Sequence, residues 1–189
     1  MRSGDDRTTL ITGRRLVINE DREKMEKDFT HFNEQGHARM VDVTEKDVTF
    51  RTASASGTVF MAPETVRAVR TGGIAKGDVL SVAQVAGIMA AKRTAEIIPM
   101  CHPLMLSGVD IRFAVNDSSI DIFAEVRCKG ETGVEMEALT AVSAAALTIY
   151  DMCKALQKDM KISDIRLLKK TGGVRGDYTL RDPGSPSAV

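Results

Sequence analysis

Residues 109–128 read VDIRFAVNDSSIDIFAEVRC and contain two runs, 109–115 and 119–128, in which apolar and polar residues alternate. A period of two is typical of strands that bury one face. The polar residues between the runs favour a tight turn. The stretch therefore predicts an antiparallel hairpin, and this hairpin decides the class of fold into which the neighbouring segments must fit.

The segments on either side of this hairpin have the patterns of further strands and helices. The strand-like segments are 48–61 and 162–170, and the helix-like segments are 62–73, 81–98 and 132–157. The middle of the long segment 132–157 is rich in alanine and nearly free of charge, so we expect it to be buried on several sides. Helices that alternate with antiparallel strands predict an α+β fold, a ferredoxin-like antiparallel sheet with helices packed on one face.

Composition limits the classes of function. The chain has 189 residues and no net charge, with 26 basic and 26 acidic side chains, and only 4% of its residues are aromatic. A global positive field and stacking platforms are therefore both missing, which argues against nucleic acid as a partner. Any anion site must be a local cluster of cations.

Cysteine usage and hydropathy bear on the compartment. Cys101, Cys128 and Cys153 are an odd number of widely spaced cysteines, which favours a reducing compartment over a disulfide framework. No apolar run is long enough to cross a bilayer. We expect a cytoplasmic protein without a membrane partner.

The chain ends differ in composition from its middle. We predict an N-terminal extension over 1–28, one domain over 29–178 and a flexible C-terminal tail over 179–189.

His102, in the stretch PMCHPLM (99–105), is the most conspicuous candidate for chemistry. A zinc site needs three or four ligands, and no partner pair at ligand spacing is present, so we expect no metal site. An unperturbed pKa of about 6.5 suits a histidine to proton transfer. From its neighbours alone, a structural histidine is as good an interpretation.

Two groups of charged residues lie at opposite ends of the predicted long helix. Asp151 and Lys154 are three residues apart and share a helix face, either as a surface ion pair or as part of a site. Glu135 and Glu137 could simply complement the helix dipole in the first turn. Glu135 and Asp151 would be about 24 Å apart along the helix. If both residues are functional, either two subunits form one pocket or the two ends of the helix have different functions.

Three cations outside this helix are candidates for binding phosphate. Lys76 and Lys170 each lie near glycines at the boundary of an element, where backbone N–H groups can approach an anion. Arg51 lies on a predicted strand and could make a bidentate contact with phosphate. A solvated lysine or an arginine at the rim of a site fits the same pattern.

Seven segments together resemble one family. They are HARMVDV (37–43), KGDV (76–79), AGIMAAKRT (86–94), IIPMCHPLM (97–105), TGVEMEALTA (132–141), ALTIYDMCKA (146–155) and KKTGG (169–173). Their order and spacing are similar to those of the cyclic pyranopterin monophosphate synthase family, the accessory enzymes of early molybdenum cofactor biosynthesis. The resemblance covers about residues 29–178.

The resemblance implies a fold, an assembly and a reaction. The expected fold is ferredoxin-like, and the expected assembly is a homohexamer, a trimer of dimers, with the active site at a subunit interface. The implied substrate is (8S)-3′,8-cyclo-7,8-dihydroguanosine 5′-triphosphate, and the products are cyclic pyranopterin monophosphate and diphosphate. No cofactor is implied, although Mg²⁺ could accompany the triphosphate.

The resemblance also implies roles for individual residues. Asp151 corresponds to the active-site acid of the family, with Lys154 as its proton-transfer or charge-stabilising partner, and His102 binds substrate and acts in acid–base chemistry. The other residues implied for the pocket are Lys76, with a catalytic role, Met100, Cys101, Glu135, Met136, Glu137 and Lys170, with Arg51 at the phosphates. Two alternatives are a catalytically silent nucleotide- or phosphate-binding module on the same scaffold and an RNA-binding ferredoxin-like domain.

Overall fold

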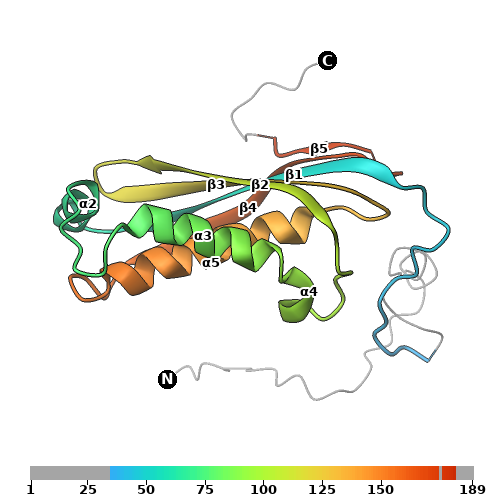
Figure 1. Ribbon diagram of the computed structural model, residues 1–189, viewed down its shortest axis with the longest axis horizontal. Helices are drawn as coiled ribbons and strands as arrows, with labels where there is room; N and C mark the ends of the chain where they lie inside the picture. The colour runs from blue at the N-terminus through green and yellow to red at the C-terminus, as the bar shows by residue number, and fades with distance from the viewer. Residues whose placement is uncertain (1–34, 175, 182–189) are drawn as a thin grey trace, which may run out of the picture. The chain divides into compact units, whose positions relative to one another are not determined.

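The computed structural model of the protein describes residues 35–174 and 176–181 (Figure 1). The chain divides into two units at Val41, and every helix and strand discussed below belongs to the second unit, which begins at Asp42. Residues 35–41 of the first unit contain a turn and no helix. The predicted N-terminal extension (1–28) lies outside the described residues, as do residues 182–189 of the predicted tail.

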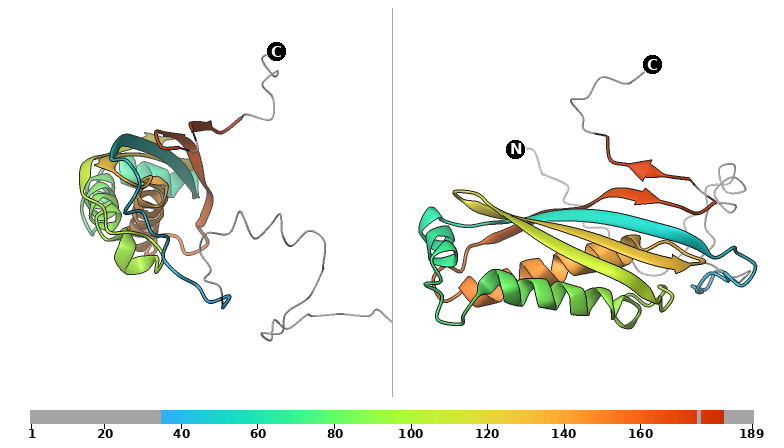
Figure 2. Two further views of the ribbon diagram at one scale, coloured as in Figure 1. Left: turned by 90° about the vertical axis from the view of Figure 1, so that its right-hand side faces the viewer. Right: turned by 45° about the horizontal axis from the view of Figure 1, so that its top comes forward.

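The strands of the described part of the second unit form one five-stranded antiparallel sheet in the order β2-β3-β1-β4-β5 (Figure 2). Their bounds are β1 Thr49–Phe60, β2 Leu106–Val115, β3 Ser119–Gly130, β4 Lys161–Thr171 and β5 Tyr178–Thr179. The predicted hairpin is confirmed: Val115 pairs with Ile120, and the backbone N–H of Asn116 donates to the carbonyl of Ser119 at 2.9 Å.

The helices are α2 Pro63–Arg70, α3 Val79–Ala91, α4 Thr94–Ile97 and α5 Glu135–Cys153. Figures 1 and 2 show α3 and α5 side by side on one face of the sheet. Each of them connects two strands that are separated by one intervening strand, α3 between β1 and β2 and α5 between β3 and β4. This arrangement is the ferredoxin-like α+β fold, as predicted.

The core lies between the sheet and these two helices, and small residues allow them to pack closely. Alternate residues of β3, from Ile120 to Cys128, are buried, and α5 packs against α3, β1, β3 and β4. A Cβ on Gly87 of α3 would lie only 2.8 Å from the carbonyl oxygen of Ala141 on α5. The alanine-rich middle of α5 is therefore buried on several sides, because larger side chains would separate the two helices.

The prediction of a single helix over 81–98 is wrong. α3 ends at Ala91 and α4 begins at Thr94, since Arg93 leaves the helical region of backbone space with φ −117° and ψ 17°. The buried hydroxyl of Thr94 donates to the carbonyl of Ala91 at 3.1 Å, and such bonds compete with helical hydrogen bonding.

Three further details differ from the sequence predictions or complete them. The predicted helix 132–157 is shorter at both ends, because α5 spans only Glu135–Cys153. The two-residue strand β5 was not predicted, and it pairs with Lys169 and Lys170 of β4. In the described part of the chain, every helix is too short or too polar to cross a bilayer.

Candidate active site

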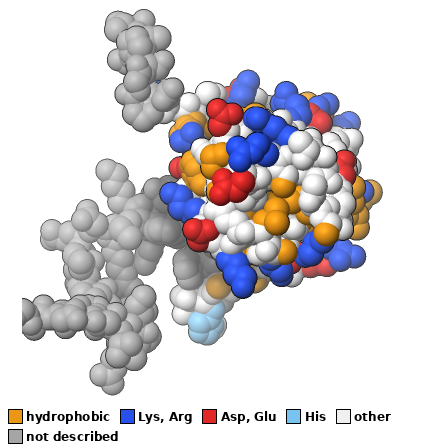
Figure 3. All heavy atoms as spheres, turned by 90° about the vertical axis from the view of Figure 1, so that its left-hand side faces the viewer, with side chains coloured by type: hydrophobic (Ala, Val, Ile, Leu, Met, Phe, Trp, Pro, Cys, Tyr) orange, Lys and Arg blue, Asp and Glu red, His pale blue; other side chains and the backbone are white. Residues whose placement is uncertain are grey.

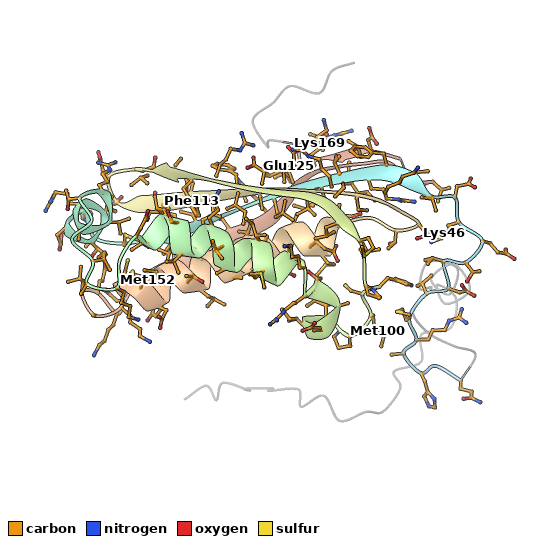
Figure 4. All side chains as sticks on the ribbon, viewed as in Figure 1. Lys46, Met100, Phe113, Glu125, Met152 and Lys169 are labelled. Carbon is orange, nitrogen blue, oxygen red and sulfur yellow. The ribbon has the colours of Figure 1, made fainter. Side chains whose placement is uncertain are left out.

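Helix α5 carries charged candidate residues at both of its ends. Glu135 is its first residue, and Asp151 lies in its last turn. The helix is continuous between them, so its rise places these residues about 24 Å apart. In Figure 4, Met152 lies at one end of the helical layer and Met100 lies toward the other. One copy of the chain therefore presents two separate groups of candidate residues.

The first group is the aspartate cluster, which consists of Asp151, Lys154 and Lys76. Lys154 Nζ lies 2.6 Å from Asp151 Oδ1, and Lys76 Nζ lies 2.7 Å from Asp151 Oδ2. Lys76 Nζ also donates to the backbone carbonyl of Asp151 at 2.8 Å, where a cation satisfies an exposed carbonyl of the last helical turn. Lys154 can reach Asp151 because it lies three residues further along, one turn of the helix away. Lys76 comes from the segment between α2 and α3.

The two lysines control the charge of the aspartate cluster. The hydrogen bond from Lys154 and then the one from Lys76 lower the pKa of Asp151 to about 2, so the carboxyl is ionised at neutral pH. The hydrogen bond that Lys154 donates to Asp151 also raises the pKa of Lys154, which keeps that ammonium protonated. All three side chains are about half exposed. Figure 3 views this end of the molecule, where basic, acidic and apolar side chains are interspersed.

The second group is the glutamate cluster, which consists of Glu135, Glu137, Lys170, Arg51 and Cys101. Lys170 Nζ lies 3.1 Å from Glu135 Oε1, and both side chains are about one quarter exposed. Lys170 pairs with Ala53 in the sheet and therefore lies on the face that packs against α5. This ion pair thus links the end of β4 to the start of α5.

Glu137 is the buried carboxyl of this cluster. Only 3% of it is exposed, and this burial, together with the negative charge of Glu135, raises its pKa from 4.5 to about 7. A hydrogen bond from its own backbone N–H acts in the opposite direction. Glu137 is therefore a carboxyl that can gain or lose a proton near neutral pH.

Arg51 is buried, and its side chain binds backbone. Its Nε donates to the carbonyl of Gly130 at 3.0 Å and its Nη2 to the carbonyl of Glu131 at 2.9 Å. Its Nη1 lies so close to Gly173 that a Cβ there would collide with it. The guanidinium thus holds the β3–α5 loop against the turn after β4. The predicted contact between Arg51 and phosphate stays a prediction.

Met100, Cys101 and His102 lie between α4 and β2 and are partly buried. Burial raises the pKa of the Cys101 thiol, and the negative charge of Glu137 raises it further, which places Cys101 near the glutamate cluster. Met136 is exposed on the first turn of α5. The roles implied for these residues stay predictions, as does the acid–base role of His102.

The structure brings some predicted site residues together and separates others. It unites Lys76 with Asp151 and Lys154, and Lys170 with Glu135, but it leaves the two clusters at opposite ends of α5. Within residues 35–174 and 176–181, no three His, Cys, Asp or Glu side chains are grouped so that they could hold a metal ion.

Two polar residues near the aspartate cluster, Tyr150 and Gln157, were not predicted from the sequence. Tyr150 Oη donates to the carbonyl of Lys158 at 2.6 Å, and Gln157 bonds to the start of α2. These residues fix the segment that follows α5. A tyrosine and a glutamine near the end of a helix are too common to signal such a role in a sequence.

Comparison with known proteins places this geometry in a family. The model of the MoaC family matches residues 40–173, a range that includes every predicted site residue. The chain belongs to the MoaC family. Members similar to it include proteins named cyclic pyranopterin monophosphate synthase from three bacteria. The one from Peptoclostridium acidaminophilum is 62% identical over 151 residues, which are 80% of this chain and 96% of the relative.

The other two members give the same result. The protein from Brevibacillus brevis is 61% identical over 155 residues, 82% of this chain and 97% of the relative. The protein from Chloroflexus aurantiacus is 60% identical over 153 residues, 80% of this chain and 94% of the relative. The MoaC match confirms the family that the motifs suggested.

Proposed function

We propose that this chain is a cyclic pyranopterin monophosphate synthase, a phosphorus–oxygen lyase of molybdenum cofactor biosynthesis. It converts (8S)-3′,8-cyclo-7,8-dihydroguanosine 5′-triphosphate into cyclic pyranopterin monophosphate and diphosphate. The observation that carries the proposal is the identity of about 60% to synthases of the MoaC family over a range that includes both clusters. Mg²⁺ would enter as a companion of the substrate triphosphate.

The aspartate cluster supports the phosphate chemistry of this reaction. To close the cyclic phosphate, a sugar oxygen bonds to the α-phosphorus while the bond from that phosphorus to the diphosphate oxygen breaks. Negative charge then grows on the departing diphosphate, and the ammonium groups of Lys76 and Lys154 can stabilise it. Asp151 is ionised and bonded to both lysines, which suits it to hold the two ammonium groups in place. The proton of the sugar hydroxyl passes to the departing diphosphate.

The glutamate cluster supports the chemistry of the ring. A guanine-type edge presents N–H groups, which require acceptors such as the carboxylate of Glu135. Rebuilding the ring system also requires protons to move on nitrogen and oxygen atoms. We assign these proton transfers to Glu137, whose pKa is about 7, and to His102. Met100 and Cys101 precede His102 in the chain and complete this part of the proposed site.

A second copy of the chain would bring the two clusters together. They are about 24 Å apart in one copy, which is too far for one small substrate. If two α5 helices pack antiparallel about a two-fold axis, the aspartate cluster of one copy faces the glutamate cluster of the other. The large apolar side chains exposed on α3 and α5 suit such packing: Val82, Val85, Met89 and Leu147. We propose a homohexamer, a trimer of such dimers.

The direct test is to incubate the purified protein with the cyclic triphosphate and to measure diphosphate and cyclic pyranopterin monophosphate. We expect both products in equal amounts. Binding of the triphosphate without release of diphosphate would instead identify a silent binding module and contradict the proposal. The Asp151→Asn variant in the same assay controls for contaminating activity.

Mixing two inactive variants tests whether the site is shared. Asp151→Asn removes one half of the site and Glu137→Ala removes the other. After joint unfolding and refolding, a mixed dimer should contain one intact site, so about one quarter of all sites should recover activity. No recovery, with mixed dimers present by mass spectrometry, would mean that each site is built from a single copy.

A further inference from the structure

We propose that Gln157 is a positioning residue for Lys76. In this inference, which rests on the proposed function, Gln157 fixes the start of α2, and α2 in turn fixes the segment that delivers Lys76 to Asp151. Gln157 does not need to touch the substrate for this role. It acts on the reaction only through the position of the Lys76 ammonium group.

Gln157 connects the end of α5 to the start of α2. Its Oε1 accepts a hydrogen bond from the backbone N–H of Ala62 at 2.8 Å and another from the hydroxyl of Thr65 at 3.0 Å. Its Nε2 donates to Asp159 Oδ1 at 2.9 Å, which orients the amide so that its oxygen faces α2. Figure 1 shows α2 beside the loop that follows α5.

Helix α2 depends on this bond because its own sequence does not cap it. The residue at its N-cap position is Ala62, whose side chain cannot accept a hydrogen bond, and Pro63 begins the helix. Thr65 is almost fully buried, so its hydroxyl would lose its partner without Gln157. The amide of Gln157 thus acts as a cap supplied from another part of the chain.

The segment that carries Gln157 is itself anchored to α5. The backbone N–H of Gln157 donates to the carbonyl of Cys153 at 3.2 Å, and Tyr150 Oη donates to the carbonyl of Lys158. Gln157 therefore transmits the position of the α5 terminus, where Asp151 lies, to the start of α2.

Helix α2 leads directly to Lys76. Tight turns follow it, in which Gly73 N–H donates to the carbonyl of Ala68 and Gly77 N–H donates to the carbonyl of Ile74. Lys76 then contacts Asp151. Lys154 needs no such route, because it is only three residues from Asp151. Loss of the Gln157 bond should therefore displace Lys76 and leave Lys154 in place.

Competitive acetylation of lysines, read by mass spectrometry on the full-length protein, tests this asymmetry without substrate. In Gln157→Leu, which keeps the size of the side chain but removes the acceptor, we expect Lys76 to react severalfold faster than in the parent protein. Lys154 should react at the parent rate, and the exposed Lys169 is the internal reference. Equal rates for Lys76 in variant and parent would overturn the proposal.

Two further variants separate positioning from a general loss of structure. Gln157→Glu combined with Asp159→Asn keeps an oxygen acceptor for Ala62 and Thr65 and exchanges donor and acceptor between residues 157 and 159, so Lys76 should react at about the parent rate. Gln84→Leu is the matched control, because Gln84 Nε2 donates from α3 to the carbonyl of Ile111 and, within the described part of the chain, has no bond to α2. Faster reaction of Lys76 in Gln84→Leu would also overturn the proposal. So would a rate in the Gln157→Glu, Asp159→Asn double variant as high as that in Gln157→Leu.

Kinetics give the functional readout. A displaced Lys76 should lower kcat of Gln157→Leu by about tenfold, with little change in KM, since misplaced catalytic groups act mainly on the chemical step. An unchanged kcat would contradict the proposal. If the parent protein had no synthase activity at all, the proposed function would fail, but the acetylation experiment would still decide the role of Gln157.

Discussion

At the C-terminal end of α5, the carboxylate of Asp151 is half exposed and flanked by two lysines, whereas at the N-terminal end the carboxyl of Glu137 is almost fully buried beside another glutamate. The lysines lower the pKa of Asp151 to about 2, and burial raises that of Glu137 to about 7. Thus one end holds a fixed negative charge at neutral pH, and the other end holds a group that can exchange a proton.

This contrast indicates that the two clusters have different functions. A constant arrangement of charges suits the binding and release of phosphates, because it requires no reorganisation during the reaction. A carboxyl with a pKa near the working pH suits proton transfer. Each of the following predictions tests one side of the contrast.

The largest effect is expected for Asp151→Asn, which removes the fixed charge while keeping the size of the side chain. Turnover should fall by about 10²- to 10³-fold, the usual effect of removing one preorganised charged group from a site. Thermal unfolding should change little, because Asp151 is exposed. Asp110→Asn, which removes a carboxylate paired with Arg112 on the open face of the sheet, is the control and should keep the parent rate. Turnover by Asp151→Asn at the parent rate would refute its assigned role.

Glu137→Gln tests whether burial raises the pKa of this carboxyl, through the pH dependence of the free energy of unfolding. Because the pKa is raised from 4.5 in the unfolded chain to about 7 in the folded one, the folded state binds more protons in this range, and stability falls as pH rises through it. Above pH 7, ionisation of the buried Glu137 lowers the free energy of unfolding by about 3 kcal/mol. Urea unfolding should therefore show the variant to be more stable than the parent at pH 8, with a much smaller difference at pH 4.5.

The control for this experiment is Glu125→Gln, which alters a glutamate that is paired with Arg127 on the open face of the sheet. It should retain the pH dependence of the parent. The same pH dependence in Glu137→Gln and in the parent would show that burial does not hold a proton on Glu137.

Arg51→Lys tests the scaffold of the glutamate cluster. Lysine keeps the charge but cannot bind the carbonyls of Gly130 and Glu131 at the same time with the geometry of a guanidinium. Leaving such a buried acceptor without a partner should lower the free energy of unfolding by about 1–3 kcal/mol, as measured in urea at pH 7. An unchanged stability would mean that the loop is held by other contacts.

The smallest effect is expected for Glu135→Gln, which sharpens the contrast within one cluster. The negative charge of Glu135 contributes less than burial does to the raised pKa of Glu137. Its removal should lower this pKa slightly, which ¹³C NMR of the carboxyl group can follow from pH 5 to pH 9. An unchanged or raised pKa would contradict the contribution assigned to the charge of Glu135.

Much of the fold follows from periodicity in the sequence. Alternation predicted the β2–β3 hairpin, and the alanine-rich run predicted a long buried helix. The break at Arg93 could not be predicted in this way, because residues 81–98 keep a helical pattern on both sides of it. The break depends on a threonine hydroxyl that finds a backbone partner in the buried interior.

The site was predictable only where its residues are neighbours on one element. The pair Asp151–Lys154 follows from a spacing of three in a helix. The contact between Lys76 and Asp151 joins residues 75 apart in sequence and depends on tertiary packing. The sequence predicted a bidentate contact of Arg51 with phosphate, which stays a prediction, and it gave no sign that Arg51 would bind two backbone carbonyls.

Glu135 and Glu137 show how one helical turn can separate similar residues. From the sequence they share one role as acidic residues near a helix N-terminus. Residues two apart point to nearly opposite sides of a helix. The structure accordingly leaves Glu135 in contact with Lys170 near the surface and buries Glu137.

The uninterrupted length of α5 has one more consequence. Adding or removing a single residue between its two ends would change their separation by only about 1.5 Å but would rotate one end against the other by about 100°. Asp151 would then turn away from Lys76 even though every side chain was still present. The number of residues in this helix therefore fixes the rotation of the aspartate cluster relative to the glutamate cluster, and a change of one residue alters this rotation far more than it alters their distance.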